Sequence, residues 1–200
     1  MKIKNTILYP LLLTSSLLFA EALHVESVGV NVGVASIEAK QSNTSGTITL
    51  AHQPDESFAS AELYALIDGV FEDKSKKITT NYIYSSNSDI QEHNLLLGVN
   101  KYYEYKKYNL YAGALAGISR LKWKYNPINN AKDKDFYSTS FTAGVQGGVE
   151  YPLSNTLLIG INAKYLYSGH KANLNPSTGV SGDIKHHNLF ALNLGVRVSF

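Results

Sequence analysis

Apolar and polar residues alternate with a period of two along most of this chain. The clearest stretch is His186–Phe200, where every second residue from Phe190 onward is apolar and most residues in between are small or polar. A helical period of 3.6 would scatter the apolar residues around the axis, so the alternation predicts a β-strand. Three further stretches alternate in the same way: Val28–Val34, Tyr137–Tyr151 and Ile159–Ser168.

Four more strands are predicted from less regular alternation, at Phe58–Phe71, Lys77–Ser85, Ile90–Glu104 and Tyr108–Leu121, which gives eight in all. The connections between them differ in length. Long loops are predicted at Glu38–Ser57, Lys122–Asp135 and Gly169–Asp183, and the other connections are short. The short connection Ser86–Asp89 breaks this order, and we attribute it to a misplaced strand boundary. Short turns on one side and long loops on the other are typical of an outer-membrane barrel with both termini in the periplasm.

The distribution of residue types between the two strand faces distinguishes a membrane barrel from a soluble one. A soluble barrel points its apolar face inward. Here one face carries Gly, Ser, Asn, Gln, Lys and Arg, whereas the other carries branched aliphatic residues bounded by aromatics. The aromatics form two groups: Tyr103, Tyr105, Tyr108 and Tyr111 near one turn, and Tyr82, Tyr84, Trp123, Tyr125, Tyr137, Tyr165 and Tyr167 towards the long loops. Such belts flank an apolar band that faces lipid.

The N-terminus indicates the compartment. Lys2 and Lys4 precede an apolar run, Thr6–Ala20, and Ala20-Glu21-Ala22 supplies the small residues that a signal peptidase recognises. These features predict a secretory signal peptide at residues 1–22, with the mature protein starting at Leu23 or, after cleavage at Ala20, at Glu21. A membrane anchor helix is the alternative, but spanning lipid needs about 20 apolar residues, and this run is shorter and interrupted by Pro10. The barrel domain is then predicted at residues 23–200.

The pattern over residues 23–200 and the final strand resemble the small outer-membrane barrels of the OmpA/OmpX type. The resemblance implies an all-β fold, an antiparallel up-and-down transmembrane β-barrel of eight strands in the bacterial outer membrane. It also implies that the C-terminal strand, with Val196, Val198 and Phe200, is the signal read by the barrel assembly machinery. Outer-membrane lipid and lipopolysaccharide are the further partners expected, and the protein is expected to be a monomer.

Composition excludes several other classes. A formal net charge of +2 from scattered residues does not predict a nucleic-acid partner. The absence of cysteine excludes a disulfide framework, a thiolate metal site and a lipid-modified N-terminal cysteine.

Five charged residues are expected on the inward face of the strands: Glu62, Asp68, Glu150, Lys164 and Arg197. An eight-stranded barrel is just wide enough for side chains to fill its interior, and buried charges persist only when they are paired. Their heights along the strands predict that Arg197 lies with Asp68 and Glu150, and that Lys164 lies with Glu62. We interpret the group as a structural network that closes the barrel, with a proton or ion path as the alternative.

Histidines near the last predicted loop are the other candidate site. His170, His186 and His187, with Asp183, could ligate a metal, but loop histidines are more often solvated and no H-x-x-x-H spacing occurs. Ser168, His170 and Asp183 could form a triad like that of the outer-membrane enzymes that hydrolyse lipid A. No serine follows His170 by two residues, as that deacylase pattern requires. We therefore predict no catalytic residue, no metal and no cofactor.

The sequence supports functions of three classes. We expect a non-enzymatic surface protein whose rigid barrel displays its loops for structural, adhesive or other contacts, because binding residues commonly lie on loops held by a rigid scaffold. A lipid A-modifying enzyme is the alternative. A narrow pore is weaker, since wide aqueous channels belong to barrels of about sixteen strands or more.

Overall fold

The computed structural model describes residues 24–45, 57–124, 136–174 and 181–200, which form eight antiparallel strands. The strands are β1 (His24–Ser45), β2 (Ser57–Asp68), β3 (Lys76–Ser86), β4 (Ile90–Tyr105), β5 (Tyr108–Trp123), β6 (Phe136–Pro152), β7 (Leu157–Leu174) and β8 (Ser181–Ser199). The predicted signal peptide lies outside these ranges and stays a prediction. Among the described residues, no helix combines the length and apolar composition needed to cross a membrane.

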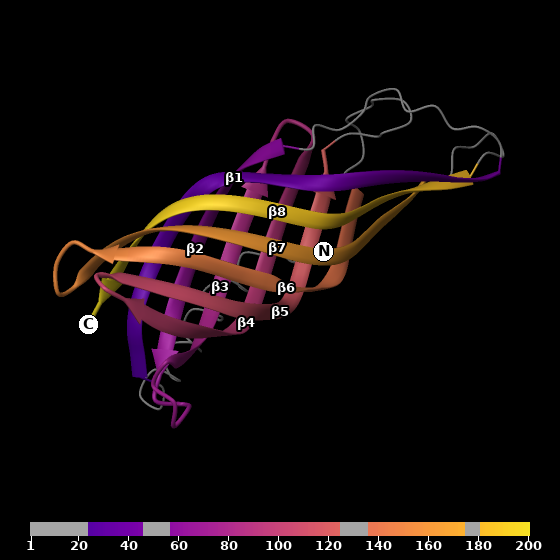
Figure 1. Ribbon diagram of the computed structural model, residues 1–200. Coiled ribbons are helices and arrows are strands. Elements are labelled where there is room, and N and C mark those ends of the chain that lie inside the picture. Colours follow the sequence, from indigo (N-terminus) through magenta and orange to yellow (C-terminus); the bar gives the residue numbers. More distant parts are fainter. Residues whose placement is uncertain (1–23, 46–56, 125–135, 175–180) are drawn as a thin grey trace, which may run out of the picture.

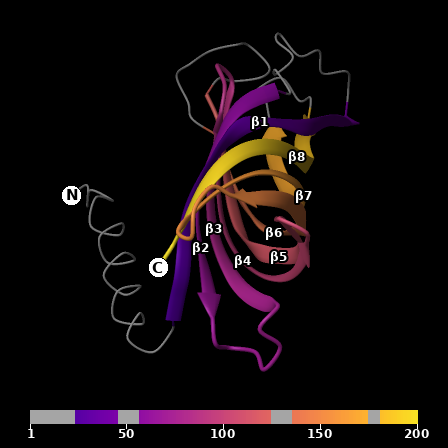
Figure 2. The same ribbon diagram turned by 60° about the vertical axis from the view of Figure 1, so that its left-hand side comes forward.

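The strands pair in sequence order and close into a barrel, because β1 also pairs with β8 (Figures 1 and 2). At the seam Ser27 lies opposite Ser199, and the N–H of Phe200 donates to the carbonyl oxygen of Glu26 over 3.0 Å. Closure leaves no free sheet edge along the barrel wall, which is the condition for a sheet to exist in lipid. The predicted class, a closed antiparallel barrel of eight strands, is confirmed.

Alternate residues of each strand face opposite sides of the wall, as the period of two predicted. On β8, Leu194 is 62% exposed whereas its neighbour Asn193 is 2% exposed. Leu192, Val196 and Val198 share the outer face with Leu194, and Arg197 is buried with Asn193. The apolar residues therefore coat the outside of the barrel, and the polar residues fill the inside.

The two ends of the barrel differ. At one end, here called the turn end, short turns join β2 to β3, β4 to β5 and β6 to β7, and Phe200 lies at the same end. Gly69 and Lys106 adopt positive φ values of 79° and 55° in the first two of these turns. The left-handed conformation is typical of glycine, and Lys106 adopts it where only two residues connect β4 to β5.

The opposite end, here called the loop end, holds the connections from β1, β3, β5 and β7. The short connection between β3 and β4 is real, so the misplaced boundary that we inferred there is wrong. Its compactness comes from Asn87, whose side-chain oxygen accepts hydrogen bonds from the N–H groups of Asp89 and Ile90, both over 2.8 Å. Asparagine is favoured in such turns because its side chain can bond the backbone locally.

Two of the predicted loops are partly strand. β1 continues to Ser45, within predicted loop Glu38–Ser57, while β7 continues to Leu174 and β8 begins at Ser181. Residues 46–56, 125–135 and 175–180 lie outside the described residues. Asn43 pairs with Gly182, and Leu174 also pairs with Gly182, so these three strands remain a sheet beyond the barrel wall. Figure 1 shows this three-stranded extension of β1, β8 and β7 projecting well past the other strands.

Candidate functional site

A bidentate ion pair lies in the lumen at the turn end. Arg197 on β8 donates from Nη2 to Oε2 of Glu150 over 2.6 Å and from Nε to Oε1 over 3.0 Å. Its Nη1 also donates to the hydroxyl of Ser27 over 3.1 Å. Glu150 is on β6, so the pair reaches across β7, where Gly160 faces inward between them. A Cβ at Gly160 would lie 3.1 Å from Cγ of Glu150, so the missing side chain lets the carboxylate approach.

Asp68, the other carboxylate that we expected near Arg197, is not part of this pair. Asp68 lies opposite His24, whereas Arg197 lies opposite Gly29, five residues further along β1. At about 3.4 Å per residue in an antiparallel strand, this offset exceeds the reach of an ion pair. Asp68 instead accepts a hydrogen bond from the N–H of Gly69 over 2.7 Å at the turn.

A second buried pair lies nearer the middle of the lumen. Nζ of Lys164 is 3.2 Å from Oε1 of Glu62, and it also donates to the side-chain oxygen of Gln146. The Glu62 carboxylate accepts further hydrogen bonds from the amides of Asn31 and Asn81, each over 2.6 Å. A buried ion pair persists only when its remaining donors and acceptors are satisfied. The structure brings together Glu62 with Lys164 and Glu150 with Arg197.

Three tyrosines fill the lumen between these two pairs: Tyr64, Tyr102 and Tyr111. The rings of Tyr102 and Tyr111 have centroids 5.2 Å apart. The space left among Tyr64, Tyr111, Glu150 and Arg197 is about 10 Å³, roughly what one water molecule requires. Tyr111 was predicted in the outer aromatic belt, and that placement is wrong because it shares the inward face of β5 with buried Leu115 and Ser119.

Buried polar residues form a third layer towards the loop end. The hydroxyl of Ser119 donates to Oε1 of Glu92 over 2.7 Å, and Nε2 of His170 is 2.8 Å from that hydroxyl. His186 lies opposite His170 on the paired strand, and its ring centroid is 5.4 Å from the ring of Trp123. All five side chains are almost completely buried.

This arrangement corrects three placements. His170 and His186 were expected on or beside a solvated loop, but β7 and β8 continue past the predicted boundaries and carry both histidines into the lumen. Trp123 was expected in the outer belt and is buried inside. His187 does lie outside the lumen, stacked on Tyr167 with centroids 5.8 Å apart. Tyr125 lies outside the described residues.

The third layer contains a serine, a histidine and a carboxylate but does not have the connectivity of a catalytic triad. In a triad the histidine is central and bonds the serine through one nitrogen and the acid through the other. Here Ser119 is central, and Nδ1 of His170 has no protein partner. In the alternative combination of Ser168, His170 and Asp183, the Ser168 hydroxyl is directed to the carbonyl oxygen of His187 over 3.5 Å and not to His170. The side chain of Asp183 lies outside the described residues.

Within the described ranges, no group of three or more histidine, aspartate or glutamate side chains is placed to hold a metal ion. Glu92, Ser119, Tyr64 and Tyr102 are among the lumen residues that sequence reasoning missed. Glu92 could have been recognised from its spacing, because it alternates in phase with Asn94 and Asn100, which are also buried.

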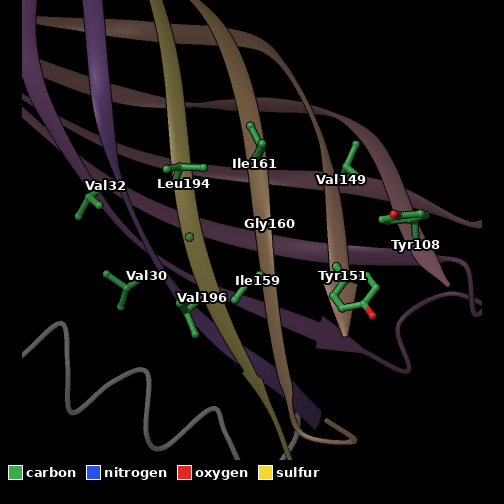
Figure 3. Close-up of a pocket in the computed structure, with 11 residues that line it drawn as sticks. Val30, Val32, Tyr108, Val149, Tyr151, Ile159, Gly160, Ile161, Leu194 and Val196 are labelled. Atoms are coloured by element: carbon green, nitrogen blue, oxygen red, sulfur yellow. The ribbon is translucent and has the colours of Figure 1, made fainter. Parts of the chain in front are cut away.

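The outside of the wall carries a shallow apolar groove of about 690 Å³ across β1, β8, β7 and β6. Figure 3 shows its side chains, among them Val30, Leu194 and Ile161, with Tyr108 and Tyr151 at the edge of the group. The two tyrosine rings have centroids 5.7 Å apart. Nearly all of the lining is hydrocarbon, so the groove suits lipid acyl chains rather than a polar substrate.

The filled lumen leads to a prediction for conductance. In planar bilayers the purified protein is expected to show at most small, rare current steps, because tyrosines and two ion pairs occupy the space within the wall. Single-channel recording at several salt concentrations is the measurement. Steady currents of porin size from the unmutated protein would contradict the structural interpretation of the interior charges.

Comparisons with known proteins agree with the fold. Residues 20–195 match the model of the OmpA-OmpF-like porin family. No curated protein matches the chain. Among solved structures, Neisserial surface protein A, from Neisseria, is 19% identical over 86% of this chain and 97% of that chain, with a TM-score of 0.57.

Two further barrels are similar at lower scores. The N-terminal barrel domain of OprF from Pseudomonas aeruginosa is 11% identical over 88% of this chain and 98% of that chain, with a TM-score of 0.47. Ail, the attachment invasion locus protein of Yersinia pestis, is 13% identical over 86% of this chain and 99% of that chain, with a TM-score of 0.40. Similarity at these identities concerns the fold and not the activity.

Proposed function

Because this chain belongs to the OmpA-OmpF-like porin family and is an eight-stranded barrel of the bacterial outer membrane, we propose that it is a non-enzymatic surface protein. Its closed barrel acts as a scaffold that displays the loop end to the cell exterior for structural, adhesive or other contacts. The termini lie on the periplasmic side, and the protein acts as a monomer.

The observation that carries the proposal is the three-stranded extension of β1, β8 and β7. Pairing continues as far as Ser45 with Ser181 and Leu174 with Gly182, beyond the last pair of β1 with β2 at Ser36 and Ser57. The strands thus run further than the wall requires, so a paired three-stranded platform lies beyond the barrel. Rigid scaffolds that present variable connections are a common basis for binding.

The closed lumen supports a role outside the barrel rather than transport or catalysis. Ion pairs and tyrosines fill it from the turn end to the middle, and the Ser119–His170–Glu92 layer is buried above them. A lipid substrate approaching from the bilayer meets the apolar outer wall and does not reach the Ser119 hydroxyl. The outer wall itself contacts outer-membrane lipid and, in the outer leaflet, lipopolysaccharide.

Biogenesis by the barrel assembly machinery is part of the proposal. Phe200 is exposed beyond the end of β8, and Val196 and Val198 lie on the same outer face. A recognition signal must be accessible, and these three side chains share one exposed surface at the seam where closure occurs.

Insertion of an epitope tag tests the orientation. We expect a tag placed between residues 175 and 180 to be labelled by antibody on intact cells. The matched control is a tag in the turn between β6 and β7, at Asn155, which should be labelled only after the outer membrane is permeabilised. The reverse pattern would contradict the proposed display of the loop end.

A further inference from the structure

The tyrosine edge of the apolar outer groove carries a cation. Lys107, in the two-residue turn between β4 and β5, places its Nζ 5.0 Å from the centre of the Tyr151 ring and 5.8 Å from the centre of the Tyr108 ring. A cation over the faces of aromatic rings is attracted by their quadrupoles. The ammonium group of Lys107 is therefore held where the apolar lining of the groove begins, at the turn end of the barrel.

The polar groups at this edge are hydrogen-bond donors. Among the described residues Lys107 forms no ion pair, since the carboxylates paired at the turn end are joined to other lysines. The hydroxyls of Tyr108 and Tyr151 likewise have no hydrogen-bond partner in the described part of the chain. One ammonium group and two hydroxyl groups can donate together to the oxygens of a single phosphate.

Behind this edge the groove is a continuous hydrocarbon surface made of two rows of outward side chains. The rows are Val30, Val196, Ile159 and Tyr151 nearer the turn end, and Val32, Leu194, Ile161 and Val149 next to them. Figure 3 shows both rows, with Tyr108 and Tyr151 beside one another at one edge. A phosphate held at the tyrosine edge would thus be joined directly to a surface that suits acyl chains.

Two paired glycines lie in the floor of the groove. Gly160 of β7 lies opposite Gly195 of β8, between the two rows, and both line the groove. On the lumen side their places are filled by neighbours, because a Cβ at Gly195 would overlap Oδ1 of Asn31 and a Cβ at Gly160 would lie 3.1 Å from Cγ of Glu150. The floor is therefore set by packing inside the barrel. A groove that is built before its ligand arrives loses less entropy on binding.

The extent of the groove matches the acyl region of one leaflet. From β6 to β1 the groove crosses three strand spacings, or roughly 14 Å at about 4.8 Å each. This length is close to half of the ~30 Å hydrocarbon core. Strands of such a barrel are tilted by about 35–45°, so an acyl chain lying across them runs obliquely through its leaflet and can stay in the groove.

We propose that this groove binds an anionic glycerophospholipid of the phosphatidylglycerol class, with its phosphate at Lys107, Tyr108 and Tyr151 and an acyl chain along the apolar rows. The single negative charge of its phosphodiester matches the single ammonium group, and its glycerol head is uncharged. Phosphatidylethanolamine carries an ammonium group of its own, which Lys107 repels. The assignment of the lipid to the periplasmic leaflet rests on the orientation proposed above.

The test places the whole protein in nanodiscs of phosphatidylcholine and titrates phosphatidylglycerol or phosphatidylethanolamine with identical acyl chains, counting bound lipids by native mass spectrometry. One surface cation contributes about a fivefold factor to the binding of anionic lipid, so phosphatidylglycerol should bind about fivefold more tightly. Lys107→Gln should remove this preference. The matched control is Lys101→Gln, because Lys101 also lies 5.4 Å from a tyrosine ring at the turn end, but that ring, Tyr103, does not line the groove. The preference should persist in this control.

A second pair of variants tests the apolar part of the groove. Val149→Trp fills the groove and should lower the affinity for both lipids while leaving the preference between them intact. Val145→Trp is the matched control, because Val145 is exposed on the same face of β6 but does not line the groove. Equal affinities for the two tryptophan variants would overturn the placement of the acyl chain.

Three outcomes with the unmutated protein would overturn the assignment without any variant. The first is equal binding of phosphatidylglycerol and phosphatidylethanolamine. The second is full displacement of phosphatidylglycerol by glycerol 3-phosphate, which has no acyl chains and should compete only weakly. The third is displacement of phosphatidylglycerol by an equal concentration of bisphosphorylated lipid A, which would assign the groove to a different amphiphile.

The nanodisc measurement does not depend on the orientation in cells. A failed tag-labelling experiment would overturn the proposed display and the choice of leaflet, while the preference for phosphatidylglycerol in nanodiscs would stand. Loss of that preference, with normal labelling on intact cells, would overturn only the phospholipid site.

Discussion

Replacing Arg197 with alanine is expected to lower the free energy of unfolding by about 3–5 kcal/mol, because removing one partner of a buried ion pair leaves the other charge uncompensated. Both carboxylate oxygens of Glu150 accept from the Arg197 guanidinium, and Glu150 is buried in the lumen. The single tryptophan, Trp123, provides a fluorescence probe for urea unfolding in lipid vesicles.

Neutralising both partners provides the control for this effect. The double variant Arg197→Met with Glu150→Gln retains most of the buried volume and removes both charges, so it should recover much of the lost stability. A double variant that is less stable than Arg197→Ala would contradict the attribution to an unpaired charge. Neither variant should open a large pore, because Tyr64, Tyr102 and the Lys164 pair still fill the lumen.

An arginine in the centre of the apolar band is the second change with a large expected effect. Leu194 lies midway along the outward residues of β8 and is 62% exposed to the lipid side. Leu194→Arg should cost about 2–4 kcal/mol of folding free energy in bilayers, the range for a cation at the midplane of such barrels. Urea titration in vesicles and the altered gel mobility of the folded barrel would measure it.

Val28→Arg is the matched control, because Val28 shares the outer face but lies next to the turn end, opposite Val198. A cation near the interface costs only about 0–1 kcal/mol. The inward neighbour Asn193 is a poor control, because it is buried and donates to Asn162 over 3.1 Å. Equal destabilisation by Leu194→Arg and Val28→Arg would show that no depth-dependent lipid environment surrounds the barrel.

The strands that form the wall were predictable because lipid and lumen impose opposite polarity on alternate residues. For β1, β6, β7 and β8, that contrast alone was enough to assign which residues face outward. The contrast disappears beyond the membrane, where both faces of a strand meet water. The sequences of the extensions of β1, β7 and β8 consist mostly of polar residues, so the pattern there is the same as that of a loop.

The site within the lumen was predictable only in part, for a related reason. Arg197, Glu150 and Lys164 stand out because each interrupts a row of small or apolar residues. Glu92 lies between Gln91 and His93, so both faces of β4 are polar at that height, and only its phase with Asn94 and Asn100 further along the strand places it inside. Residues such as Tyr111 and Trp123 are compatible with either face, and only their phase on β5 places them inside.

The seam between β1 and β8 determines when folding can be completed. Ser27 lies opposite Ser199, at nearly opposite ends of the chain, so β1 keeps an open edge until synthesis and export have delivered β8. Unpaired edges promote association with other chains, and contacts between residues so distant in sequence form slowly. The barrel therefore cannot close before its last strand is present, and until then the edge of β1 is open to pairing with another chain.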